Sequence, residues 1–177
     1  WRVQLTILYS VFAGIALALV VYNLALWASL RHRFQLYYSA MVGSLMAYAF
    51  SSSGLLNFVF PHVANTDRLK CNYLLLMLTG AMALQFVRHF FGGRIIGVAL
   101  DRAILAITAI TGLTTLAVLV LAPWQIQLLD RFYFVSMLGM VCLIPPMRLQ
   151  AWRAKSPYFI MVVASWSAPV VISLMRA

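Results

Sequence analysis

Two apolar runs joined by a short basic corner occupy residues 22–61, and this stretch most constrains how the chain can fold. The corner is Arg31-His32-Arg33, and it falls where a first membrane-spanning helix would have to end. The apolar run after the corner is long enough to cross a bilayer again. The stretch therefore predicts a transmembrane hairpin whose turn carries positive charge.

Further apolar runs follow along the chain, separated by basic residues, glycines and prolines. Hydrophobic residues make up 64% of the 177 positions and charged residues only 9%, which is typical of a polytopic membrane protein. We predict an all-α fold, a polytopic transmembrane helix bundle that forms a single domain over residues 1–177. The six expected helices cover about residues 5–30, 35–58, 71–91, 102–121, 128–145 and 157–175. Residues 62–70 are expected to form a polar loop, and Pro145-Pro146 to end the fifth helix.

Basic residues concentrate on one side of this predicted bundle. The corners after the first, third and fifth helices hold eight of the 13 Lys and Arg residues, and the other side holds five. The eight are Arg31, Arg33, Arg88, Arg94, Arg102, Arg148, Arg153 and Lys155. Because basic residues favour the cytoplasmic side, this imbalance predicts an amino terminus outside and a last residue that returns to the outside.

Residues that carry enzymatic chemistry are scarce. The chain has three Asp, no Glu and three His, and His62 is expected on the opposite side of the membrane from His32 and His89, which argues against a three-histidine metal site. No nucleophile elbow, phosphate-binding glycine loop or paired-cysteine motif is present. The basic residues stand singly between apolar runs, which favours contact with anionic lipid over nucleic-acid binding. The sequence thus predicts neither catalysis nor a cofactor within these residues.

Polar residues inside the predicted helices are candidates for an intramembrane ligand or relay site. These candidates are Asn23, Tyr48, Ser52, Asn57 and Gln85. A structural role is the competing interpretation: Asn23 can bond to a neighbouring helix, and serines at positions 51–53 can bond back to the preceding turn. Gly54 and Pro169 interrupt predicted helices and are candidate hinges.

Several short motifs in the first half of the chain resemble a known family. They are Tyr22-Asn23, Arg31-His32-Arg33, Leu36-Tyr37-Tyr38, Gly54-Leu55 and Phe86-Val87-Arg88-His89-Phe90-Phe91. Over roughly residues 9–95 the chain is similar to the membrane domain of bacterial seven-transmembrane receptors with diverse intracellular signalling modules. The resemblance implies an inner-membrane sensor with an extracellular domain, seven helices and a cytoplasmic output domain in cis, such as a GGDEF diguanylate cyclase or a histidine kinase.

The chain begins at Trp1 rather than Met, and we expect it to be a fragment with six of the family's seven helices. A seventh helix after Ala177 would run inward, as the family layout requires. The leading hypothesis is a signal relay that acts as a homodimer or with a partner membrane subunit. A small transporter or subunit of a membrane complex is the alternative. A structural anchor that dimerises through Gly43, Ala47 and Ser51 is a third hypothesis.

Overall fold

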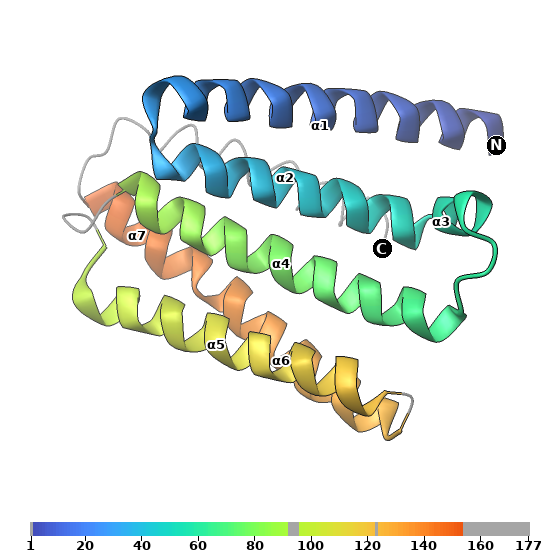
Figure 1. Ribbon diagram of the computed structural model, residues 1–177. Helices are drawn as coiled ribbons and strands as arrows, with labels where there is room; N and C mark the ends of the chain where they lie inside the picture. Colours follow the sequence, from blue (N-terminus) through green and yellow to red (C-terminus); the bar gives the residue numbers. More distant parts are fainter. Residues whose placement is uncertain (1, 92–95, 123, 154–177) are drawn as a thin grey trace.

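Seven α-helices make up the architecture of the computed structural model, which describes residues 2–91, 96–122 and 124–153. They are α1 (Arg2–Leu30), α2 (Arg33–Ser52), α3 (Leu55–Val59), α4 (Asn65–Phe91), α5 (Val98–Leu121), α6 (Ile126–Cys142) and α7 (Ile144–Arg153). The long helices lie side by side and alternate in direction, with α1 next to α2, α2 next to α4, and α5 in contact with both α4 and α6 (Figure 1). The predicted all-α bundle is confirmed. The expected sixth helix, with Pro169, lies outside the described residues, as do Arg94 and Lys155.

The bundle has two distinct ends (Figure 1). One end holds the turn between α1 and α2, the end of α4, the start of α5 and helix α7. We call it the basic end. It carries Arg31, Arg33, Arg88, Arg102, Arg148 and Arg153. At the other, the α3 end, lie the start of α1, the short helix α3 and the turn between α5 and α6. The fold thus gathers the described members of the predicted cytoplasmic set at a single end, while the side of the membrane that this end faces stays a prediction.

Four helical segments in the described part of the chain are long and apolar enough to cross a membrane. They are Ser10–Leu30, Asn65–Phe91, Val98–Leu121 and Ile126–Gln150. Helix α2 is not among them, because glutamine, tyrosine and serine dilute its apolar residues. It nevertheless lies between α1 and α4, and its 20 residues extend about 30 Å, close to the thickness of a bilayer's hydrocarbon core.

Several helix boundaries differ from the sequence expectation, and three of these differences have a clear physical reason. Helix α4 begins at Asn65, so two thirds of the expected polar loop forms its first turns, because polar residues can continue a helix beyond its apolar part. Pro145 and Pro146 do not end the helical run but lie in the first turn of α7, where a proline needs no intrahelical amide bond. The second predicted helix divides at Gly54, whose φ of 84° is the left-handed conformation that favours glycine.

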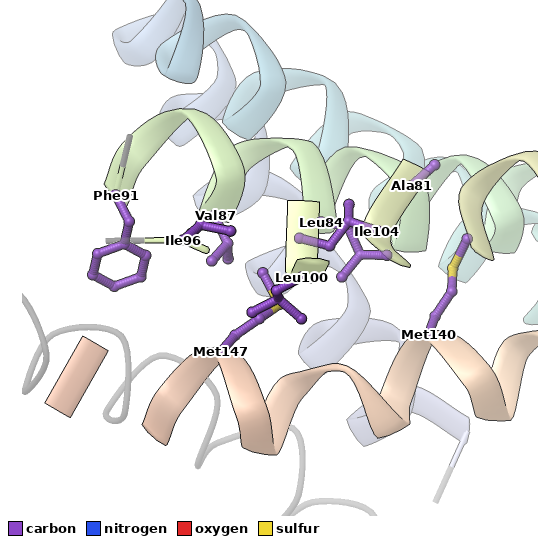
Figure 2. Packing of buried hydrophobic residues seen from close by; sticks show 9 residues of the cluster. All are labelled: Ala81, Leu84, Val87, Phe91, Ile96, Leu100, Ile104, Met140 and Met147. Atoms are coloured by element: carbon purple, nitrogen blue, oxygen red, sulfur yellow. The ribbon is translucent and has the colours of Figure 1, made fainter. Parts of the chain in front are cut away.

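The main buried cluster lies between α4, the start of α5 and the α6–α7 segment (Figure 2). Ile104 is fully buried, and Leu84 and Val87 of α4 pack into the same cluster. Met140 and Met147 approach from either side of the α6–α7 junction (Figure 2). This cluster fixes α7 against α4 and α5 near the basic end.

Hydroxyl groups link the helices at mid-depth. Thr79 of α4 donates to the Ser44 hydroxyl of α2 at 3.0 Å, and Thr114 of α5 lies 3.1 Å from the Ser136 hydroxyl of α6. Each of these hydroxyls also lies within hydrogen-bond distance of a carbonyl of its own helix, so the two protons of each pair are shared among three hydrogen bonds. Such bonds satisfy polar groups without water and hold neighbouring helices in register.

Candidate functional site

A groove of about 750 Å³ runs along α4 between α2 and α6. Its volume is within the range of small-molecule sites, and apolar side chains dominate its lining. Its lining extends along α4 from Leu69 to Phe86 and reaches Ile144 at the start of α7. The groove therefore connects the α3 end of the bundle with the α6–α7 junction.

Polar groups in the groove gather toward the α3 end. Tyr48 comes from α2, Asn72 and Tyr73 from α4, and Asp130 and Tyr133 from α6. The Tyr73 hydroxyl donates to Asp130 Oδ1 at 2.5 Å, and the Tyr133 hydroxyl donates to the backbone carbonyl of Tyr73 at 2.9 Å. The two tyrosine rings meet edge to face with centroids 4.7 Å apart. These contacts fasten α6 to α4 and fix the position of the Asp130 carboxylate.

Two acceptors in this polar cluster lack full partners. Asn72 Oδ1 is buried and accepts no hydrogen bond within the described part of the chain. Asp130 forms no ion pair with any residue that the structure describes. A buried acceptor without a donor is costly, so the cluster is suited to a ligand that donates hydrogen bonds.

The floor and the far end of the groove are apolar. On α4 the groove is lined by the small residues Gly80 and Ala83, and on α6 it is lined by Met137 and Met140. A Cβ added at Gly80 would lie 2.8 Å from Met140 Sδ, so the flexible Met140 side chain would have to shift. Tyr38 and Phe86 close the groove toward the basic end, with ring centroids 5.6 Å apart.

Among the sequence-predicted candidates whose side chains the structure describes, only Tyr48 lines this groove. Asn23 is on α1 and donates to the Leu19 carbonyl of its own helix at 2.9 Å, while Ser52 bonds back to the Ala49 carbonyl at 3.3 Å. Gln85 accepts from Arg88 at 3.4 Å near the basic end. Asn57 belongs to α3, and its side chain is outside the described set. The structure thus does not bring together the four candidates whose side chains it describes.

Asn72, Tyr73, Asp130 and Tyr133 were missed because each has an ordinary interpretation in the sequence. Asp130 stands beside Arg131 near a helix start, which is typical of an interfacial anchor. One signal in the sequence could have revealed the site: Asp130 is an acid one turn inside an apolar segment, and ionisable groups within membrane helices are often functional. The described residues contain no group of three His, Cys, Asp or Glu side chains close enough to hold a metal ion.

A second set of polar contacts ties the helices together at the basic end. Arg88 in the last turn of α4 makes a bidentate ion pair with Asp101 in the first turn of α5; its Nη2 donates to Asp101 Oδ2 at 3.0 Å. The Gln150 side chain of α7 accepts from the Gly97 amide at 3.1 Å. The His89 ring stacks near Tyr37 of α2, with centroids 4.6 Å apart. The ends of α4 and α5 are therefore linked to both α2 and α7.

Comparison with known proteins agrees with this architecture. The family model described as 7TM diverse intracellular signalling matches residues 5–177, which is nearly the whole chain. No curated protein and no solved structure gives a significant match. The match extends the resemblance of the first half through the apolar segments of the second half. The chain belongs to the 7TM diverse intracellular signalling family, and it is a membrane receptor or sensor domain linked to signalling.

Proposed function

We propose that this bundle is the signal relay of a bacterial inner-membrane receptor. In this proposal, an extracytoplasmic or intramembrane signal changes helix packing, and the change controls a cytoplasmic output domain of the GGDEF diguanylate cyclase or histidine kinase type. The family match is the observation that carries the proposal. The concentration of basic residues at the end where α7 lies supports an output on that side.

The route of coupling follows from the position of the groove. Its lining includes Met140 and Ile144, which flank the α6–α7 junction. Met140 also belongs to the core cluster that holds Met147 of α7. A ligand that displaces these side chains would bias the position of α7, because packed helices change between discrete arrangements rather than deform continuously. Gly54 and Pro169 remain candidate hinges in this scheme.

The contact between Gln150 and the Gly97 amide provides a test of the relay. Because the last residue is predicted to lie outside, the chain is fused through one added inward-running membrane helix to a GGDEF domain, and cyclic di-GMP is measured in cells for the parent, Gln150→Ala and Gln127→Ala. Loss of one hydrogen bond changes a two-state equilibrium by about 0.5–1.5 kcal/mol, so Gln150→Ala should change the output about two- to tenfold. Gln127 is exposed at the α3 end of α6, and its variant is the matched control.

The alternatives predict different outcomes in the same cells. A structural anchor would leave the output unchanged when the bundle is exchanged for an unrelated dimerising membrane segment. A transporter or a complex subunit would show no change of output in either glutamine variant. As a relay, the bundle would act as a homodimer or with a partner membrane subunit, and cross-linking in membranes tests that assembly.

A further inference from the structure

We propose that the groove between α2, α4 and α6 binds a single-chain amphiphile with a protonated amine head group. The head group would lie at the polar cluster near the α3 end, and the chain would lie along α4 toward Ile144. This inference rests on the proposed sensor function and names the ligand class of its intramembrane site.

The polar cluster selects the head group. Asp130 is an acid without a basic partner within the described residues, and Asn72 Oδ1 is a buried acceptor without a donor. An ammonium group has three donors and no acceptor, which matches a cluster whose free groups are the acceptors of Asp130 and Asn72, both of which line the groove. The Asp130 side chain is exposed, so a head group can reach its carboxylate, and ionisable residues in membrane segments often act as ligand counter-ions. The same carboxylate would repel a sulfate or phosphate head group.

The remainder of the groove fits one flexible apolar chain. From Asn72 to Phe86 the groove follows α4 for about 21 Å, which exceeds the roughly 15 Å half-thickness of a hydrocarbon core. Met41, Met137 and Met140 line it, and methionine side chains adapt to apolar ligands of variable shape. A volume of about 750 Å³ accommodates a single chain with its head group.

Binding is measured on the full chain purified in phosphatidylcholine nanodiscs. Dodecylamine, dodecanol and dodecyl sulfate are titrated below their micellar concentrations, and the shift in unfolding temperature gives the apparent affinity of each. Dodecylamine should bind about tenfold or more tightly than dodecanol, because only the amine makes charge-assisted hydrogen bonds. Dodecyl sulfate should bind more weakly still.

Three variants locate the site. Asp130→Asn should weaken dodecylamine about tenfold or more and remove its advantage over dodecanol. Asp67→Asn is the matched control, because Asp67 is an exposed acid at the same end of α4 that does not line the groove. Leu45→Trp fills the groove from an exposed position on α2 and should abolish binding of the amine without disturbing the buried core.

Equal affinity for the three probes would overturn the proposal, as would equal losses in Asp130→Asn and Asp67→Asn. Binding that survives Leu45→Trp would place the amine elsewhere and also reject the site. Absence of dodecylamine binding to the parent would overturn the proposal as well. Since no output domain enters this measurement, a normal Gln150→Ala effect without amine binding would reject the ligand and retain the relay.

Discussion

Arg88 is in the last turn of α4 and pairs with Asp101 in the first turn of α5. Each charge also suits its position, because cations are favourable at helix carboxyl ends and anions at amino ends. The side chains of both residues are about one-third exposed, so the pair is neither fully solvated nor fully buried. The bidentate geometry therefore joins the two helices across the connection between them.

Removal of either partner should lower the unfolding temperature of the protein in nanodiscs. Asp101→Asn leaves the Arg88 guanidinium with only the Gln85 contact, and Arg88→Gln leaves Asp101 without its cation. The exchanged pair, Arg88→Asp with Asp101→Arg, should recover part of the loss but not all of it, because each charge then opposes its helix dipole. Arg102→Gln removes an exposed neighbouring charge as the control. An unfolding temperature equal for Asp101→Asn and Arg102→Gln would contradict the structural role of the pair.

At the scale of helices, alanine substitutions at two glycines are expected to have opposite effects on the stability of the bundle. A Cβ at Gly139 of α6 would lie 2.6 Å from Ile107 Cδ1 of α5, whereas a Cβ at Gly43 of α2 meets nothing within 4 Å. Gly139→Ala should thus destabilise the bundle by about 1–2 kcal/mol through overpacking. Gly43→Ala should be neutral or stabilise by up to about 1 kcal/mol through helix propensity.

Unfolding of both variants in nanodiscs checks this pair of predictions. A destabilised Gly43→Ala variant would show that a second helix packs closely on α2 in the membrane. That result would favour the anchor hypothesis, in which Gly43, Ala47 and Ser51 form a dimer face. Within the described chain Ser51 is already buried, with only 1% of its surface exposed, so these residues do not form one open stripe.

Hydrophobic pattern predicted the helices well and their ends poorly. Apolar runs indicated α1, α4, α5 and α6 because a bilayer requires long apolar helices. The first turns of α4 were missed because they are polar, and α7 was missed because Pro145-Pro146 begins a helix as readily as it ends one.

The candidate site was harder to predict for a different reason. Tyr73 and Asp130 are 57 positions apart, and their hydrogen bond depends on the packing of α6 against α4. Polarity alone selected Asn23, Ser52 and Gln85, whose side chains bond within their own helices. A single sequence does not distinguish a polar side chain that faces a groove from one that bonds to its own backbone.

At the scale of the whole molecule, the path of the chain depends on whether α2 crosses the membrane. Its composition argues against a crossing, but several of its polar groups are satisfied internally. Ser39 donates to the Gln35 carbonyl at 2.9 Å, and Ser44 donates to the Met41 carbonyl at 2.9 Å. Bonds of this kind reduce the cost of placing hydroxyls in lipid, and a hydropathy count does not include them. We therefore expect α2 to cross together with its neighbours α1 and α4.

Cysteine labelling tests this path. After Cys71 and Cys142 are replaced by alanine, single cysteines are introduced at His32, His62 or Trp124, and intact spheroplasts are treated with a membrane-impermeant maleimide. Positions 62 and 124 lie at the α3 end and should react, whereas position 32 lies at the basic end and should react only after permeabilisation. If α2 stayed on one side of the membrane, the cysteines at positions 32 and 62 would either both react with the maleimide in intact spheroplasts or both fail to react. Labelling of position 32 alone in intact spheroplasts would retain the crossing of α2 but reverse the orientation, which would contradict the assignment of the basic end to the cytoplasm.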